Sequence, residues 1–258
     1  MLHGEYCHNC GEKVISNKDF ALKTLLEQAI DSITHIDSKL FKSFSYLLTK
    51  PGQLSMAYTA GNRRPFMKPF QLFILTNMLF FIFLSNMDIF RKPANWWFNQ
   101  TIDGGYQVKK RVNEIVVLKK SSIEEVSVLY DDKSNTLAKG FIIVVLPVIS
   151  LIMAVLNIKK KLQVGKHLIF AVHFFSFTLF FIVLWSELMR LVPYTFNNIQ
   201  WGIPILLVLL IYLILSVKNF YHDKWPWAIV KSIVALGLII ITINFYRSGI
   251  SILALNLI

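Results

Sequence analysis

The sequence predicts an all-α membrane protein, in which about five transmembrane helices follow an N-terminal cytoplasmic amphipathic helical segment. Of its 258 residues, 55% are hydrophobic, whereas soluble domains average about 45–50%. The excess lies in blocks in which about 18 consecutive residues carry no charge, the pattern of membrane spans. Lysines and arginines gather between these blocks and tryptophans at their borders, as they do in membrane proteins.

The chain divides into three parts: a polar head at 1–19, the amphipathic segment at 20–68, and the transmembrane bundle at 69–258. Apolar residues recur at three- and four-residue steps through 20–49, which predicts a helix with one apolar stripe. Such a stripe marks an interaction surface, for the membrane, for a protein partner or for a second copy. Pro51 and Gly52 end this stretch, and Gly61 closes a short helix after it.

The five predicted spans are Phe70–Phe90, Gly140–Ile158, Leu168–Leu188, Trp201–Phe220 and Trp225–Tyr246. Pro147 is expected to kink the second span because proline cannot donate a backbone hydrogen bond. The apolar tail Ser248–Ile258 is too short to span a bilayer by itself.

One long polar stretch, 91–139, separates the first two spans. It contains β-branched runs, so its secondary structure is open between strand and helix. The run Ser121-Ser122-Ile123-Glu124-Glu125 is typical of a helix start. We expect this stretch to be an extracytoplasmic loop.

The net charge is +12, but most basic residues flank the apolar blocks, so nucleic-acid binding is not expected. Lys159, Lys160, Lys161 and Lys166 lie between spans two and three, whereas the next loop holds only Arg190. The positive-inside rule then places the N-terminus in the cytoplasm and the C-terminus outside. The loop 91–139 is also basic, which argues against this orientation, although its length is near the point where the rule weakens.

The two cysteines, Cys7 and Cys10, form one CxxC. Two thiolates at this spacing bind Zn²⁺ from a tight turn, but a structural zinc site needs four ligands. His3 and His8 are the nearby candidates for the others, so any zinc site here is incomplete. The alternatives are an inert thiol pair and a redox pair.

Polar residues within the spans are candidates for an intramembrane site: His167, His173, Asn77 and Asn244. An ionisable group inside a membrane suggests function. The competing interpretation is a neutral histidine hydrogen-bonded to another helix. The two asparagines would bond across helices as packing contacts.

At the border of the first span, Arg63, Arg64 and Lys68 are predicted to bind anionic lipid headgroups. Glu187 and Arg190 have the spacing of an ion pair along one helix. No arrangement of nucleophile, base and acid is recognisable, so no catalytic residue is assigned.

These features resemble the domain of unknown function 3667 family of bacterial multi-pass membrane proteins. The likeness rests on the ordered segments Tyr6–Lys13, Thr34–Asp37, Leu48–Gly52, Tyr58–Pro69, Leu146–Pro147 and His167–Phe174. The resemblance implies an inner-membrane protein with an N-terminal zinc ribbon, of which this chain has half, because only one CxxC is present. Lys166 and Phe175 stand where the family often has glutamate and a second histidine. The family has no established activity.

Three functions remain open: a non-enzymatic scaffold or accessory subunit, which we favour, a small transporter or channel component, and a lipid-acting membrane enzyme. A transporter should have a water-filled cavity at His173, Asn77 or Asn244. A scaffold should have a tightly packed bundle with an exposed stripe. An enzyme needs ionisable groups that converge at one membrane face.

Overall fold

The computed structural model describes residues 38–84, 87–99, 105–191 and 198–258, and these residues form helices and connecting turns without any strand. Four helical stretches are long and apolar enough to cross a membrane: Ile123–Leu156, Val164–Arg190, Gly202–Tyr221 and Trp225–Asn256. The prediction of an all-α, multi-pass membrane protein is therefore confirmed.

The first predicted span is shorter than expected. Helix α3 covers Pro69–Phe83, only 15 residues, or about 22 Å at 1.5 Å per residue, against a hydrocarbon core of about 30 Å. Pro69 starts the helix and the N–H of Leu84 caps it on the carbonyl of Phe80. The described residues thus hold four long membrane helices and one short one.

The second span begins earlier than its apolar block. Helix α6, Ile123–Phe141, passes through the 3₁₀ turn η2, Ile142–Val144, into α7, Val145–Leu156. The irregular turn lies just before Pro147, which has no N–H to donate four residues back, so the expected distortion is present.

The described part of the polar stretch 91–139 is helical. Helix α4 covers Ala94–Trp97, α5 covers Gly105–Lys119 and α6 follows. The Ser122 hydroxyl accepts the N–H of Glu125 at 3.2 Å, and the Glu125 carboxylate accepts the N–H of Ser122 at 3.1 Å. The helix start proposed there is a complete capping box.

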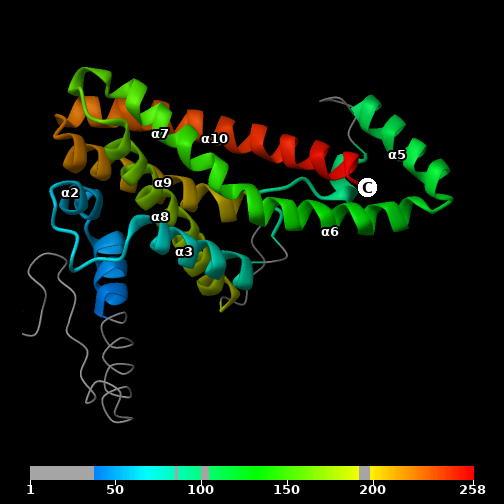
Figure 1. Cartoon of the computed structure of the whole chain (residues 1–258), viewed down its shortest axis with the longest axis horizontal. Coiled ribbons are helices and arrows are strands. Elements are labelled where there is room, and N and C mark those ends of the chain that lie inside the picture. The colour runs from blue at the N-terminus through cyan, green and yellow to red at the C-terminus, as the bar shows by residue number, and fades with distance from the viewer. Residues whose placement is uncertain (1–37, 85–86, 100–104, 192–197) are drawn as a thin grey trace, which may run out of the picture.

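The fifth span also extends further than expected. Helix α10 runs without interruption over Trp225–Asn256, and so includes most of the tail assigned as a separate end. Its 32 residues measure about 48 Å, well beyond one hydrocarbon core. The surplus of α10 projects beside the start of α6 and beside α5, as Figure 1 shows.

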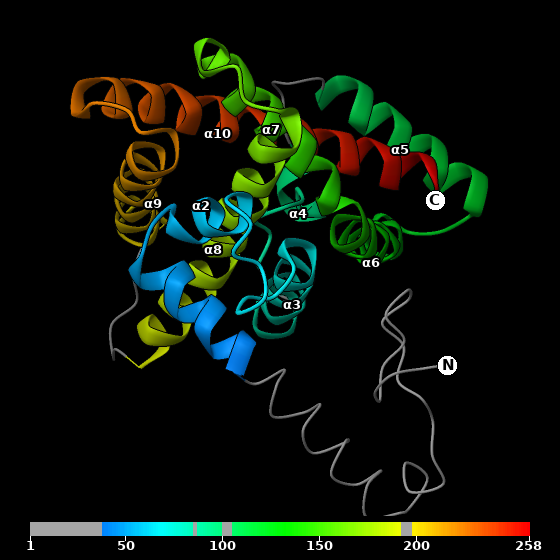
Figure 2. The same cartoon turned by 60° about the vertical axis from the view of Figure 1, so that its left-hand side comes forward.

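Helix α8, Val164–Arg190, is the centre of the bundle: α3 and α7 pack along it, and α9, Asn198–Tyr221, also contacts it. Helix α2, Gln53–Thr59, packs on α8 and α9. A further helix at 38–49 precedes α2 and buries Ser43 and Leu47. Figure 2 shows both of these short helices in front of α8, between α9 and α3.

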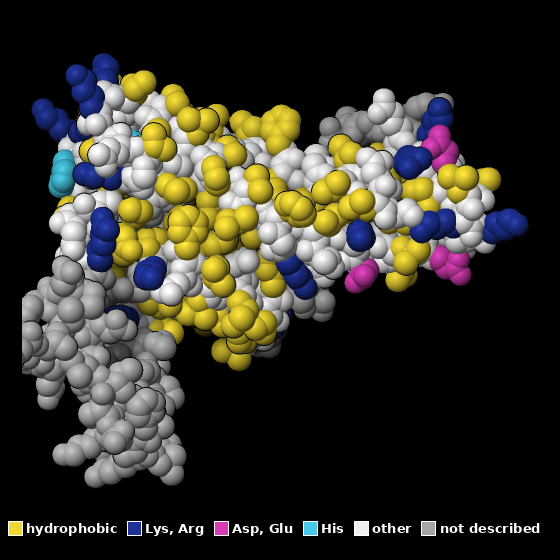
Figure 3. Space-filling view, in the orientation of Figure 1, with side chains coloured by type: hydrophobic (Ala, Val, Ile, Leu, Met, Phe, Trp, Pro, Cys, Tyr) yellow, Lys and Arg dark blue, Asp and Glu magenta, His cyan; other side chains and the backbone are white. Residues whose placement is uncertain are grey.

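The two ends of the molecule differ in the charges that they carry. The lysine-rich end contains the turns at 157–161 and 222–224, and the arm contains α4, α5, α6 and the last turns of α10. Figure 3 shows apolar side chains over the middle of one face, basic side chains gathered at the lysine-rich end, and both charge signs on the arm. The arm has its own small hydrophobic core, which includes Trp97, Val112, Tyr130 and Leu255.

Candidate functional site

The segment 38–68 is held on the bundle by hydrogen bonds from two spans. Tyr212 of α9 donates its hydroxyl to the carbonyl of Leu47 at 2.8 Å. Asn219, two turns further along α9, donates its amide to the carbonyl of Pro51 at 2.9 Å. Both carbonyls lie where the helix at 38–49 ends, a place where backbone carbonyls have no partner within the helix, and both are paired here.

Gly52 makes the closest approach between this segment and α9. Its φ of +76° is a left-handed conformation, which glycine adopts without a Cβ penalty. A Cβ atom at this position would lie 2.6 Å from the carbonyl oxygen and 2.9 Å from the Cα of Ser216. Only glycine therefore allows the chain to turn here in contact with the backbone of α9.

His173 lies where the segment meets α8. Its Nδ1 is 2.9 Å from the Oγ of Ser55, and the ring of Tyr58 meets it edge-on at 6.2 Å between centroids. Both Ser55 and His173 are buried. Among the described residues, the Nε2 atom of His173 has no hydrogen-bond partner.

This serine–histidine pair lacks two features of a nucleophilic site. A working nucleophile needs room for a substrate beside it and a third group that orients the base. Ser55 and His173 are 2% and 3% exposed, which leaves little access from the surface, and among the described residues no carboxylate bonds to the ring. The contact instead fits the interpretation of a neutral histidine bonded to another helix.

His167, which precedes His173 by six residues on α8, makes a contact of the same kind nearer the lysine-rich end. Its Nδ1 lies 2.8 Å from the hydroxyl of Tyr221 on α9, and the two rings stack at 5.5 Å between centroids. The two histidines share a helix, but each bonds to a different element. The structure therefore does not bring them together at one site.

The two asparagines are placed differently from the cross-helix packing expected of them. Asn244 donates its amide to the carbonyl of Ile240, on its own helix, at 3.0 Å. The Oδ1 atom of Asn77 is buried and has no hydrogen-bond partner among the described residues. Neither asparagine lies beside the histidines in a common cavity of the described chain.

A charge cluster that the sequence analysis missed links the two turns of the lysine-rich end. The side chain of Asp223 is 6% exposed, and its carboxylate lies 2.8 Å from the Nζ of Lys160 and 2.6 Å from the Nζ of Lys231. Lys231 also donates to Asn157 at 2.8 Å. Burial acts to raise the pKa of Asp223, but the hydrogen bonds and charges of both lysines outweigh it and hold the pKa below its usual range. The sequence feature that could have indicated this cluster is a single acidic residue, Asp223, within a basic loop.

The arm has a second charge cluster at its base. Arg91 pairs with Asp131 and lies 2.6 Å from Asp88, while the Asp131 carboxylate also accepts the N–H of Ala94 at 3.0 Å. Partial burial raises the pKa of Asp88, against the opposing charge of Arg91. Nearby, Tyr130 donates its hydroxyl to the carbonyl of Lys92 at 2.8 Å.

The residues proposed to bind lipid, Arg63, Arg64 and Lys68, are all exposed. Arg63 donates its Nε to the carbonyl of Tyr58 at 3.2 Å and lies over the ring of the same tyrosine. These residues lie between α2 and α3, on the segment that Tyr212, Asn219 and His173 hold. The pair Glu187–Arg190 forms at 2.7 Å, as its spacing predicts.

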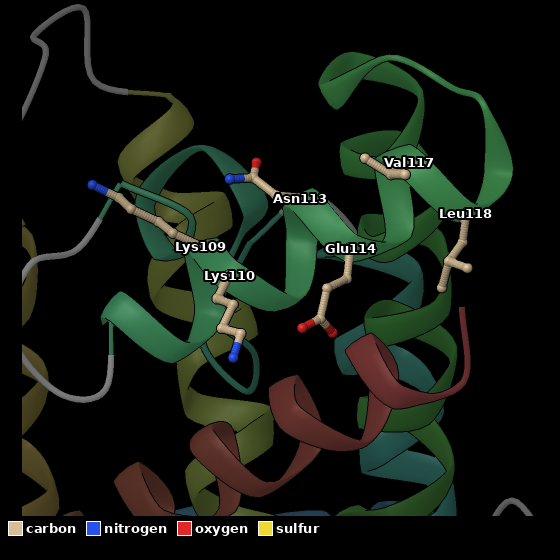
Figure 4. A pocket seen from close by; sticks show the side chains of 6 residues that line it. All are labelled: Lys109, Lys110, Asn113, Glu114, Val117 and Leu118. Atoms are coloured by element: carbon tan, nitrogen blue, oxygen red, sulfur yellow. The ribbon is translucent and has the colours of Figure 1, made fainter.

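A shallow hollow of about 750 Å³ follows α5 on the arm. Figure 4 shows that the side chains at this hollow, among them Lys110, Glu114 and Leu118, come from one helix and point in several directions. Val117 and Leu118 are each 76% exposed there. Groups that do not converge cannot enclose a small ligand.

The predicted zinc ligands Cys7, Cys10, His3 and His8 lie outside the described residues, as does the stretch 20–37 of the amphipathic segment. Within the described ranges, no three histidine, cysteine, aspartate or glutamate side chains form a metal-binding group.

Comparison with known proteins supports the resemblance noted in the sequence. Residues 37–81 match the model of a family described as Protein of unknown function (DUF3667). No curated protein and no solved structure matches the chain. The matched residues include the described part of segment 38–68, with α2 and the basic residues before α3, and most of α3 itself.

Proposed function

We propose that this multi-pass membrane protein, whose residues 37–81 match the DUF3667 family, is a non-enzymatic scaffold or accessory subunit of the bacterial inner membrane. Its docking surface is the segment 38–68, together with the preceding head. The observation that carries this proposal is the use of the polar side chains within the spans. Tyr212, Asn219 and His173 all bond to that segment.

The cost of placing polar groups in a membrane explains why this use is informative. Polar side chains within spans are expensive unless they are paired, so they remain where they serve a purpose. A transporter would direct them at a water-filled path. Here they hold segment 38–68, which lies outside the spans, in one orientation. A surface that binds a partner requires such a fixed orientation.

The exposed face of the segment is basic. Lys39, Lys42, Lys50, Arg63, Arg64 and Lys68 are exposed on it, and Phe41 adds an exposed aromatic ring. Lysine and arginine near a membrane surface each favour anionic headgroups by about 1 kcal/mol. We propose that this face lies on the cytoplasmic headgroup layer and binds a protein partner or a second copy there.

In this orientation the head, residues 1–19, also lies on the cytoplasmic side. We propose that Cys7 and Cys10 supply half of a zinc site, which His3 and His8 or groups from the partner complete. The lysine-rich end then faces the cytoplasm and the arm faces outward, as the charge bias of the short loops indicates.

The test is purification of the full chain from native membranes, with mass spectrometry of proteins retained in stoichiometric amounts. We expect one defined partner, or a second copy, to be lost when Arg63 and Arg64 are both changed to Glu. The control is the double change Lys159→Glu and Lys161→Glu, because these lysines are exposed at the same end but outside the segment. Equal retention in both variants, or no stoichiometric partner in the unmodified chain, would contradict the scaffold proposal.

A further inference from the structure

A pocket of about 480 Å³ lies among α8, α9, α10 and the turn at 88–90. Most of its wall is apolar, with Phe174 from α8, Leu209 from α9 and Ile239 from α10. This volume and this lining are typical of sites that bind small molecules.

The pocket reaches the side of the bundle, between α9 and α10. Leu206 on α9 and Ile240 on α10 both line it, and they are 43% and 40% exposed. These side chains belong to stretches long and apolar enough to cross the membrane. The opening between α9 and α10 therefore faces lipid chains, and water has no favourable contacts along the apolar walls.

One end of the pocket is polar. Along α10, the lining residues run from Leu236 to Arg247, which is about 16 Å of helix. Asn244 and Arg247 lie at the end nearer the arm, and Asp88 lines the same pocket from the turn that precedes α4. The pocket thus combines a long apolar slot with a cation and an anion at its polar end.

The arginine is available to a ligand. Its Nε donates to the carbonyl of Arg91 at 3.2 Å, but no described residue accepts a hydrogen bond from its two terminal nitrogens. Two parallel N–H groups of a guanidinium match two oxygens of a phosphate. Asp88, which lies 2.6 Å from Arg91, supplies a negative charge beside that position.

We propose that this pocket binds one membrane phospholipid whose head carries both a phosphate and an ammonium group. One acyl chain lies in the slot between α9 and α10, the phosphate pairs with Arg247, and the ammonium faces Asp88. An anionic lipid without an ammonium would leave Asp88 opposite a second negative group. The site is separate from the basic surface of segment 38–68, and it does not depend on the scaffold role.

The first test blocks the slot. Gly202 lines the pocket, and a Cβ atom there would meet no other atom within 4 Å. The backbone at Gly202 therefore accepts a side chain, and we expect that of Gly202→Leu to occupy part of the slot. The matched control is Gly237→Leu on α10, which is equally free of neighbours but lies outside the pocket.

The full chain is reconstituted in vesicles of equal phosphatidylethanolamine and phosphatidylglycerol, extracted in mild detergent, and analysed by native mass spectrometry. We expect one retained lipid per chain, enriched in phosphatidylethanolamine, in the unmodified protein and in Gly237→Leu. Gly202→Leu should lose it. Absence of retained lipid in the unmodified chain, or equal retention in both glycine variants, would overturn the proposal.

The second test examines the polar end of the pocket. Arg247→Gln should reduce retention about tenfold, because charge-assisted bonds to the phosphate are lost. Asp88→Asn should keep a lipid but lose the preference for phosphatidylethanolamine. Because Arg247→Gln also removes a contact to Arg91, Arg247→Lys serves as a second variant that keeps the charge and should retain an intermediate amount. Preferential retention of phosphatidylglycerol by the unmodified chain would show that the ammonium assignment is wrong.

Discussion

The lysine-rich end and the arm each attach a polypeptide segment to the bundle, and both use a tyrosine hydroxyl to do so. Tyr212 donates to the carbonyl of Leu47 at one end, and Tyr130 donates to the carbonyl of Lys92 at the other. The surrounding contacts differ. Segment 38–68 is held by neutral groups and by the close approach of Gly52 to α9, whereas the arm adds the charged network of Arg91, Asp88 and Asp131.

This difference follows from the surroundings of each segment. Segment 38–68 bonds to side chains that belong to the apolar stretches of α8 and α9, where neutral hydrogen bonds and close backbone contact are favoured because burying charge in lipid is costly. The arm extends beyond the length needed to cross a bilayer, so charged pairs at its base can keep partial contact with water. The family match covers the first arrangement, residues 37–81, and ends before the arm.

The largest expected difference between the two ends is the side of the membrane on which each lies. Reporter fusions at Gly165, beside the lysine-rich end, and at the C-terminus, in the arm (Figure 1), should report the cytoplasm and the exterior respectively. The measurement is the activity of a reporter that works on one side only. Reports from the same side would rule out both the orientation and the division into two ends.

The largest effect on stability is expected from Gly52→Ala. The added Cβ would meet the backbone of Ser216 at 2.6 Å, and alanine is also disfavoured at positive φ, so we expect a loss of about 3 kcal/mol or more. The measurement is thermal unfolding in detergent. Gly61→Ala is the control, because its φ is +98° but nothing lies within 4 Å of its Cβ, so only about 1–2 kcal/mol should be lost. Equal losses would mean that the contact with α9 does not hold the segment.

A smaller effect is expected when either tyrosine hydroxyl is removed. Tyr212→Phe and Tyr130→Phe each remove one hydrogen bond to the carbonyl of a buried residue, at a cost of about 1–3 kcal/mol. Limited proteolysis should separate them, with faster cleavage in 38–68 for the first variant and around residue 92 for the second. Faster cleavage at both ends in either variant would show that the two attachments are coupled rather than independent.

The smallest effect concerns the pH dependence of the two charge clusters. The pKa of Asp223 is lowered in the folded protein, so its contribution is present above the ordinary aspartate pKa, about 3.9, and is lost as the pH falls through the folded value. Asp223→Asn should therefore lower the melting temperature at neutral pH, and the difference should shrink on acidification below that point.

Asp88 provides the matched comparison in the arm. Its pKa is raised, so its contribution to stability is greatest below the unfolded pKa and declines as the pH rises through the folded value. Asp88→Asn should consequently cost less at neutral pH than Asp223→Asn. A larger loss for Asp88→Asn would show that its pairing with Arg91 outweighs its burial.

Parts of this structure were predictable because they depend on residues close in the chain. The apolar blocks located the long apolar helices of the described residues, and the run Ser121-Ser122-Ile123-Glu124-Glu125 indicated the start of α6, because capping is a local interaction. The distortion before Pro147 is likewise a property of one residue and its preceding turn. The ends of the helices were less predictable: α3 is shorter than its apolar block, and α10 continues past its own.

The contacts that distinguish the two ends depend on residues distant in the chain, and only the tertiary structure decided them. Ser55 and His173 are 118 positions apart, and Tyr212 and Leu47 are 165 apart, so no spacing in the sequence indicates that they meet. The extension of α10 has the same cause, since Ala254 and Leu255 are buried in the core of the arm. The sequence by itself determined which segments cross the membrane, because hydrophobicity is summed along the chain. Which polar groups are paired, and with what, was determined by packing between helices, because a hydrogen bond depends on position in space.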